Sequence, residues 1–307
     1  MMHMKKLFFA WALAALVLSA CTKPVAPVEE PDNTKEEEVK PEKPKSWTIK
    51  VMSYNIRVPS NETDPNNNWP VRKVGTPAMI KAQKPTVFGL QEAVTEQIKY
   101  IQENVPGYSY YGVGRDNGGA IPSASGEIMA IFWDNSQVNV IDWDTFWLSE
   151  TPDKVSKGWD AVCRRTATWC IFEHKQSKQQ FLYVNTHLDH KGVTARKEGL
   201  KLIVSKIAEL NTKGLPVILT GDFNVAPTNE CVEVLRSTMI DARVAAPVTD
   251  QYNTYNAWTA NGKSIIDYIW FSGFGGVLSY HTVRDAYAGV SLISDHYPIT
   301  AQLVIKK

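Results

Sequence analysis

The sequence predicts an α/β fold, a four-layered α/β sandwich in which two packed mixed β-sheets are flanked by helices. First, the chain of 307 residues is 44% hydrophobic and 21% charged with a net charge of +1, which is typical of a globular protein with a sizeable core. Second, short apolar and β-branched runs recur along the chain, and helical patterns lie between them. Strands of mixed spacing with helices between them pack as sheets covered by helices.

The N-terminal residues 1–20 have the pattern of a secretory signal peptide. A short basic region, Lys5-Lys6, precedes an apolar run that is too short to span a membrane, and small residues follow it. The next residue is Cys21, as in a bacterial lipoprotein signal, so we expect Cys21 to be lipidated and to anchor the exported protein to a membrane. The alternative is an ordinary signal peptide in which this cysteine has no role. Either way the protein is expected to be exported, with a periplasmic or cell-surface location for the anchored form.

Residues 21–45 differ in composition from the rest of the chain. They are rich in Pro, Glu and Lys and contain little apolar surface to bury, which predicts a disordered linker. The folded part is therefore expected to be a single catalytic domain over residues 46–307.

Strands and helices of this domain are predicted from apolar runs and their spacing. We expect helices over 69–84, 95–105 and 191–212. Strands are expected over 48–56, 87–90, 108–113, 126–133, 138–148, 166–174, 180–186, 217–219, 264–271 and 293–305.

The stretch after the strand at 217–219 carries the strongest chemical signal. Gly221 is expected to let the backbone turn, and Asp222 and Asn224 follow two residues apart, so both side chains can point into one pocket. Asp222 can act there as a base or metal ligand, and Asn224 as a neutral hydrogen-bond donor. The alternative is that both are only turn formers, because Gly, Asp and Asn are common where strands end.

Other polar residues also lie at strand ends or in the loops beside them. Together with Asp222 and Asn224 they are Asn55, Glu92, Glu127, His187, Asp267, Asp295 and His296. This set is rich in oxygen and poor in thiolate, which favours Mg²⁺ or Mn²⁺ over zinc. Histidines beside carboxylates suit phosphoryl chemistry, in which the site stabilises charge and positions a water.

Several of these residues have a plainer alternative. Asp267 lies inside an apolar strand, where it can form a structural ion pair or hold a catalytic histidine. Glu127 can be a surface residue of an edge strand, and Asp189 and His190 read as helix-capping or solvent-exposed residues. Cys163 and Cys170 are close enough in sequence to form a disulfide in an oxidising compartment, a pairing that their spacing leaves open.

Seven short motifs, in order along the domain, resemble those of the endonuclease/exonuclease/phosphatase superfamily, whose fold is that of deoxyribonuclease I. They are Ser53-Tyr-Asn-Ile56, Gly89-Leu-Gln-Glu92, Gly126-Glu127, Asn185-Thr-His-Leu188, Gly221-Asp-Phe-Asn224, Ile266-Asp-Tyr-Ile269 and Ser294-Asp-His296. Each is weak alone, but seven in the same order are a specific signature. The segments 66–72 and 146–152 also look similar to those of secreted or lipoprotein bacterial members of this superfamily.

The resemblance implies a role for each matching position. Glu92 is the principal metal ligand, with Asn55 beside it and Asp295 near the metal. Asp222 activates the attacking water, and Asn224 donates to a phosphate oxygen. His296, held by Asp267, and His187, paired with Glu127, stabilise the transition state. Arg165 resembles a phosphate-contacting arginine of some members, although Arg164 is an equal candidate.

The implied enzyme is a metal-dependent phosphoesterase whose substrate the sequence leaves open. The charges outside the first 45 residues are nearly balanced, without the basic stripe of strong nucleic-acid binders. We expect hydrolysis of a phosphodiester, including a nuclease outside the cytoplasm; the alternatives are a phosphatase on a phosphorylated sugar, inositol or lipid head group, and an inactive binding lipoprotein. Trp69 and Arg72 are candidate substrate contacts with an alternative structural role. No protein partner is expected, and the protein is expected to be monomeric.

Overall fold

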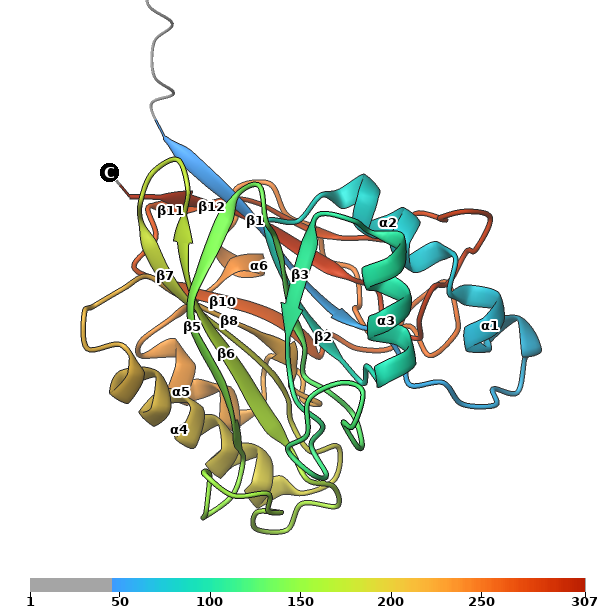
Figure 1. Ribbon diagram of the computed structural model, residues 1–307, viewed down its shortest axis with the longest axis horizontal. Coiled ribbons are helices and arrows are strands. Elements are labelled where there is room, and N and C mark those ends of the chain that lie inside the picture. The colour runs from blue at the N-terminus through green and yellow to red at the C-terminus, as the bar shows by residue number, and fades with distance from the viewer. Residues whose placement is uncertain (1–45, 307) are drawn as a thin grey trace, which may run out of the picture. The chain divides into compact units, whose positions relative to one another are not determined.

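In the computed structural model, residues 46–306 are described and form two six-stranded β-sheets packed face to face, with helices on the outer faces (Figure 1). The predicted four-layered α/β sandwich is confirmed. The expected signal peptide, lipidated Cys21 and linker lie outside the described residues. Within residues 46–306 no helix has the length and apolar character needed to cross a membrane.

The first sheet has the strand order β11-β12-β1-β2-β4-β3. Its strands are β1 (Trp47–Asn55), β2 (Val87–Gln91), β3 (Tyr108–Tyr111), β4 (Ile131–Asp134), β11 (Gly276–Thr282) and β12 (Ile299–Ile305). The helices of this half are the 3-10 helix η1 (Pro65–Asn67), α1 (Trp69–Arg72), α2 (Gly75–Gln83) and α3 (Thr95–Asn104).

The second sheet has the strand order β5-β6-β7-β8-β10-β9. Its strands are β5 (Val138–Trp147), β6 (Thr166–His174), β7 (Gln180–His187), β8 (Val217–Asp222), β9 (Ile240–Asp241) and β10 (Asp267–Ser272). The helices of this half are α4 (Val193–Leu210), the 3-10 helix η2 (Glu230–Val232), α5 (Glu233–Arg236) and α6 (Ala242–Ala245).

Both sheets follow the same plan around a central parallel pair. β1 pairs parallel with β2 in the first sheet, β7 pairs parallel with β8 in the second, and all other pairings are antiparallel. Parallel strands end at the same edge of a sheet, so the carboxyl ends of β1 and β2 meet at one edge of the first sheet and those of β7 and β8 at one edge of the second, and hydrogen bonds between residues at these ends show that the two edges lie together. The strands β10 and β12 run the opposite way and begin near these ends.

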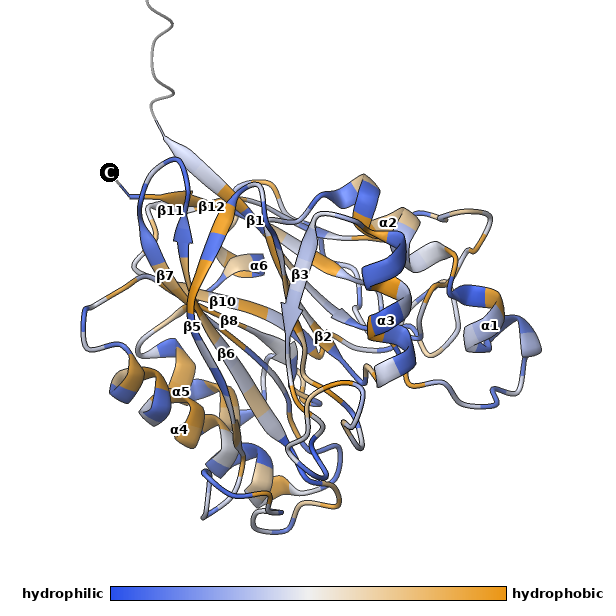
Figure 2. Cartoon of the chain, viewed as in Figure 1, coloured by the Kyte–Doolittle hydropathy of each residue, from blue (hydrophilic) through white to orange (hydrophobic). Residues whose placement is uncertain are grey.

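The core has three layers that match this architecture. Apolar side chains of both sheets meet in a central cluster, which includes Val51, Phe172 and Ile269. A second cluster packs α4 against the outer face of the second sheet, and a third packs α2 and α3 against the first. Figure 2 shows hydrophobic residues in most strands, mixed with paler and hydrophilic ones, and α4 carries both hydrophilic and hydrophobic residues. This two-sided burial explains why the strands read as nearly continuous apolar runs.

Several element boundaries differ from the sequence-based prediction. The helix expected over 69–84 is broken into α1 and α2 by a turn at 73–74. The strand expected from 126 begins only at Ile131, and the last strand begins at Ile299 rather than 293. The strand β11 was not predicted, because a bulge between Val277 and Ser279 interrupts the alternation of buried and exposed residues.

Candidate active site

Polar side chains from both sheets converge at the edge where the central parallel strands end. β1, β2, β7 and β8 deliver residues at or just after their carboxyl ends: Asn55, Glu92, His187, Asp222 and Asn224. β10 begins with Asp267, and the segment before β12 supplies Asp295 and His296. The sandwich therefore brings together residues that are up to 241 positions apart in sequence.

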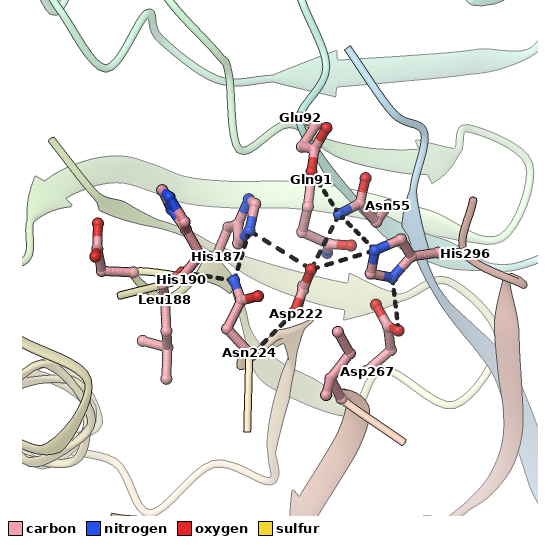
Figure 3. A network of polar contacts seen from close by, with 12 residues as sticks. Asn55, Gln91, Glu92, His187, Leu188, His190, Asp222, Asn224, Asp267 and His296 are labelled. Atoms are coloured by element: carbon pink, nitrogen blue, oxygen red, sulfur yellow. Dashed lines mark hydrogen bonds and ion pairs between the residues drawn. The ribbon is translucent and has the colours of Figure 1, made fainter. Parts of the chain in front are cut away.

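Asp222 lies at the centre of this group and is 1% exposed (Figure 3). Its Oδ2 accepts a hydrogen bond from Nδ2 of Asn55 at 3.0 Å. The same oxygen is 3.5 Å from Nε2 of His187 and 3.7 Å from Nε2 of His296. Burial, reinforced by the neighbouring carboxylate of Asp267, raises the pKa of Asp222 to about 7, which suits a general base near neutral pH.

Asp222 and Asn224 do point into one pocket, but not for the reason the sequence suggests. Gly221 lies inside β8 rather than in a turn, and a Cβ there would come within 2.4 Å of the carbonyl oxygen of Thr186. Gly221 thus permits close approach to β7. The chain turns at Asn224, which has φ 55°, and its backbone N–H donates to Oδ1 of Asp222 at 2.9 Å.

His296 forms a tight pair with Asp267. Its Nδ1 donates to Oδ2 of Asp267 at 2.9 Å, which leaves Nε2 directed toward Asp222. Burial disfavours the charged imidazole, but the negative charge and hydrogen bond of Asp267 outweigh it and raise the pKa of His296 to about 10. The ring of Tyr255 packs against the imidazole with centroids 4.9 Å apart. His296 is therefore a fixed, positively charged donor at neutral pH.

His187 has the opposite character. Burial, and the positive charges of Arg165 and His296, hold the pKa of His187 well below its usual value. The amide nitrogen of Asn224 is fixed by the carbonyl oxygen of Leu188 at 3.0 Å and donates to Nε2 of His187 at 3.0 Å. The neutral imidazole therefore carries its proton on Nδ1.

Glu127 lies beside His187 in the cleft and is not a surface residue. Its Oε2 is 3.8 Å from Nδ1 of His187, and its close partner is Nη1 of Arg115 at 2.6 Å. Burial raises the pKa of Glu127, although Arg115 opposes this. The expected pairing of His187 with Glu127 is thus present at ion-pair distance, without a hydrogen bond.

Glu92 and Asp295 are the carboxylates of the cleft that could hold a divalent cation. Burial opposes ionisation of Glu92, but the positive charge of His296 and hydrogen bonds from Asn55 and the backbone of Val58 hold its pKa below the usual value. Burial raises the pKa of Asp295 despite the charge on His296. Both carboxylates line the cleft, and their oxygen-only donor set fits Mg²⁺ or Mn²⁺.

Asn55 does not offer its oxygen to this site. Its Oδ1 accepts from the backbone N–H of Arg57 at 3.0 Å, and its Nδ2 donates to Glu92 at 3.1 Å as well as to Asp222. In this arrangement Asn55 aligns the two carboxylates rather than binding a metal. The expectation that it is a metal ligand is therefore not met by its side-chain orientation.

The cleft above these residues has a volume of about 450 Å³. Besides the groups already described, it is lined by Arg57, Val58, Cys163, Arg165 and His190. Arg165 is 5% exposed and reaches it from before β6, with Nη2 3.2 Å from Nδ1 of His190 and Nη1 3.9 Å from Glu127. The alternative residue, Arg164, instead pairs with Asp116 at the surface. Of these two candidates, Arg165 is the one that lines the cleft.

Trp69 and Arg72 do not line the cleft, and the structure favours their structural role. Arg72 is 1% exposed, and its guanidinium donates to the backbone carbonyls of Ile56, Arg57, Asn67 and Ile293. Trp69 is 5% exposed and packs against Tyr100 and the guanidinium of Arg72. They support the loop after β1 from behind.

Asp189 is neither a helix cap nor exposed to solvent. It is 1% exposed, and its carboxylate accepts from four backbone N–H groups, those of Val162, Cys163, Lys191 and Gly192. Burial opposes its charge, but these donors hold its pKa well below the usual value. Asp189 thereby fixes the two loops that carry Arg165 and His190, whereas His190 is exposed as expected.

The cysteines of the described residues form no disulfide. Cys163, Cys170 and Cys231 are all free, so the pairing of Cys163 with Cys170, which the sequence left open, is not formed. Cys170 lies in β6 with its side chain in the central core, whereas Cys163 lies in a loop at the cleft.

The sequence does not mark Arg57 and Tyr255, which line the cleft, or Arg115, which pairs with Glu127 beside it. Arg57 directly follows the first motif, and this position beside Asn55 is the one sequence signal that could have marked it. Tyr255 and Arg115 come from loops without periodic patterns, and no signal in the sequence distinguishes them.

Comparison with known proteins agrees with this geometry. The model of the endonuclease/exonuclease/phosphatase family matches residues 52–296. A family protein from Bacteroides thetaiotaomicron is 35% identical, with a TM-score of 0.78 over 85% of this chain and 99% of that chain. A mannosyl-6-phosphatase of Bacteroides thetaiotaomicron is 36% identical, with a TM-score of 0.77 over 84% of this chain and all of that chain. The human nocturnin catalytic domain, with bound sulfate, shares the fold at 21% identity, with a TM-score of 0.63 over 83% of this chain and 93% of that chain.

No curated protein matches the chain. Members of the matched family hydrolyse phosphoester bonds and are generally dependent on a divalent metal. The motifs, the two-sheet sandwich and the acidic and histidine site all agree with the family match. The chain belongs to the endonuclease/exonuclease/phosphatase family.

Proposed function

We propose that the protein is a Mg²⁺- or Mn²⁺-dependent phosphatase that acts on a phosphorylated sugar. The chemistry rests on one observation: the buried carboxylate of Asp222 lies between the neutral imidazole of His187 and the charged imidazole of His296. The substrate class is supported by the 36% identity to a mannosyl-6-phosphatase over the whole of that chain. A cleft of about 450 Å³ has room for a monosaccharide phosphate.

The residues divide the work of an in-line attack by water on phosphorus. Asp222, with its raised pKa, takes the proton of the water. His296 donates from Nε2 to a phosphoryl oxygen, and Asp267 keeps this imidazole charged and oriented. Arg165, which is buried beside the cleft, adds positive charge.

His187 and Asn224 form a second, neutral hydrogen-bonding arm. Asn224 donates one amide N–H to Nε2 of His187 and the other to the carbonyl oxygen of Leu188, so its role is to fix the tautomer and position of His187 rather than to donate to the phosphoryl group. Glu92 and Asp295 would hold the cation, which supplies charge neutralisation on the phosphoryl oxygens. The charge that develops in the transition state is thus met from both sheets at once.

The test uses residues 46–307 with mannose 6-phosphate, p-nitrophenyl phosphate, bis-p-nitrophenyl phosphate and plasmid DNA. We expect release of phosphate from the monoesters in Mg²⁺ or Mn²⁺, no release in EDTA, and loss in Asp222→Ala. Preferential cleavage of the diester or nicking of the plasmid would instead favour the phosphodiesterase that the sequence alone suggests. No turnover of any of these with folded protein would contradict the proposal.

Export and anchoring through Cys21 are a separate proposal, supported by the signal pattern of residues 1–20. Metabolic labelling of the full chain with a radioactive fatty acid should label the wild type and not Cys21→Ser. Labelling of both, or of neither, would contradict the anchor.

A further inference from the structure

We propose that Arg57 is a specificity-determining residue, a built-in cation that binds the extra negative charge of a phosphomonoester at the metal end of the cleft. This inference rests on the proposed phosphatase function. Arg57 lies in the loop after β1 and lines the cleft. Its φ is 60°, a backbone conformation that glycine adopts most easily, so the bend itself does not call for a charged residue.

The guanidinium of Arg57 lies between the two carboxylates that would hold the cation. Its Nη1 is 3.8 Å from Oε2 of Glu92 and 3.7 Å from Oδ2 of Asp295. Both distances are too long for hydrogen bonds, so the group is attracted to these oxygens without being bonded to them. Its side chain is 30% exposed, and among residues 46–306 Nη1 and Nη2 have no hydrogen-bond partner.

Glu62 holds the other side of the guanidinium. Its Oε1 accepts from Nε of Arg57 at 2.8 Å and from Oγ of Ser60 at 2.5 Å. Its Oε2 accepts from the indole of Trp258 at 3.2 Å, and its backbone N–H donates to Oδ1 of Asn68 at 2.8 Å. Glu62 is therefore a positioning residue that fixes Arg57 through Nε and leaves the two terminal amino groups for a ligand.

This arrangement suits a monoester better than a diester. At neutral pH a phosphomonoester carries nearly two negative charges, whereas a diester carries one. Once a bound cation neutralises the charges of Glu92 and Asp295, the positive charge of Arg57 is available to interact with the phosphate. The free edge of a guanidinium matches two oxygens of one phosphate group, and a terminal phosphate has an additional charged oxygen to offer it.

The same geometry makes Arg57 compete with the divalent cation before substrate binds. A positive charge less than 4 Å from two ligand oxygens repels a second cation at the same oxygens. Removal of this charge should therefore tighten metal binding and weaken phosphate binding. A purely structural arginine would move neither affinity in this opposed way.

The experiment compares Arg57→Gln, Arg57→Lys and Glu62→Gln with the wild type. The matched control is Arg236→Gln, which breaks an Arg–Glu ion pair of 2.9 Å on α5, on the surface. Mn²⁺ affinity is measured by titration calorimetry without substrate, inorganic phosphate affinity is measured with Mn²⁺ saturating, and kcat/KM is measured for p-nitrophenyl phosphate and bis-p-nitrophenyl phosphate.

For Arg57→Gln we expect roughly 10-fold tighter Mn²⁺ binding, roughly 10-fold weaker phosphate binding, and a monoesterase kcat/KM that falls at least about 10-fold more than the diesterase value. Arg57→Lys should keep the wild-type Mn²⁺ affinity, because the positive charge stays. It should lose phosphate affinity, because an ammonium group lacks the two parallel N–H donors of the guanidinium. Glu62→Gln should show a weaker form of the Arg57→Gln phosphate effect.

Unchanged Mn²⁺ and phosphate affinities in folded Arg57→Gln would overturn the proposal, as would equal losses on both esters. The two binding measurements need no turnover. If the wild type hydrolyses none of the esters, the proposed phosphatase function is rejected. The Mn²⁺ and phosphate affinities would still test whether Arg57 repels the metal and binds phosphate. Circular dichroism and thermal melting of each variant establish that the comparison is between folded proteins.

Discussion

Asp267→Asn is the sharpest test of the charge arrangement in the active site. The change keeps a hydrogen-bonding group at 2.9 Å from Nδ1 of His296 but removes the negative charge. In the wild type the pKa of His296 is about 10 against an ordinary 6.5, which at about 1.4 kcal/mol per unit corresponds to roughly 5 kcal/mol in favour of the charged form. Asp267 is the leading source of this stabilisation.

If Asp267 supplies about half of that energy, the pKa of His296 falls to about 8 in the variant. The active form carries the proton, so the alkaline limb of kcat/KM moves from about pH 10 to about pH 8. At pH 9 most of the His296 imidazole is then deprotonated in the variant, so its kcat/KM should be roughly 10-fold lower than that of the wild type. At pH 7 the imidazole is charged in both proteins, and this effect on kcat/KM should be small. Asp267 also raises the pKa of Asp222, so the acid limb should move below pH 7 as well.

The assay is kcat/KM for p-nitrophenyl phosphate at saturating Mg²⁺ from about pH 5.5 to about pH 9.5. A shift of the whole profile to lower pH is expected, and the NMR titration of His296 should report the same fall in its pKa. Asp142→Asn, on the exposed part of β5, is the matched control. An alkaline limb that stays in place in folded Asp267→Asn would refute the reasoning.

Three further changes test other parts of the structure. Glu92→Gln should abolish the calorimetric signal of Mn²⁺ binding and lower kcat/KM at least about 100-fold; retained metal binding would remove Glu92 as a ligand. Asp189→Asn should lower the free energy of unfolding by about 1–3 kcal/mol at pH 7, because a carboxylate that accepts four backbone N–H groups is lost. The pKa of Asp189 is lower in the folded protein than in the unfolded chain, so its charge stabilises the fold fully above about pH 4 and less as the pH falls. The difference from wild type in urea melts should therefore shrink as the pH falls toward about 3. Gly221→Ala should cost about 1–3 kcal/mol in the same melts, because its Cβ meets the carbonyl of Thr186 at 2.4 Å, and an unchanged midpoint would contradict the close approach.

Much of the active site was predictable because its polar residues lie directly beside apolar runs that the sequence identifies as strands. Glu92, Asp222 and His296 each follow or precede a clear apolar run, and in a sandwich with central parallel strands such positions meet at one edge. The cost of an unpaired buried carboxylate indicated an ion pair or a catalytic histidine as the partner of Asp267, and the family resemblance identified that histidine as His296. The motif order added the family, which spacing alone could not supply.

The remaining features depend on contacts that no local pattern records. The orientation of Asn55 is decided by the backbone N–H of Arg57, and the burial of Asp189 by four backbone donors from two loops. Trp69 and Arg72 look like surface residues in a polar stretch, yet the loop after β1 closes over them. In the fold, the segment between β8 and β10 lacks any sustained apolar period, so α5, α6 and β9 were not predicted.

The direction of β1 has a practical consequence for access to the cleft. The strand runs from Trp47 to Asn55, a span of about 26 Å at roughly 3.3 Å per residue, and only its far end reaches the catalytic residues. β12 runs back alongside it, so that Ile305 pairs with Trp47 (Figure 1). Both ends of residues 46–306 therefore lie at the opposite end of these strands from the catalytic residues, so a solid support or fusion partner joined there is attached at the end of the domain away from the cleft.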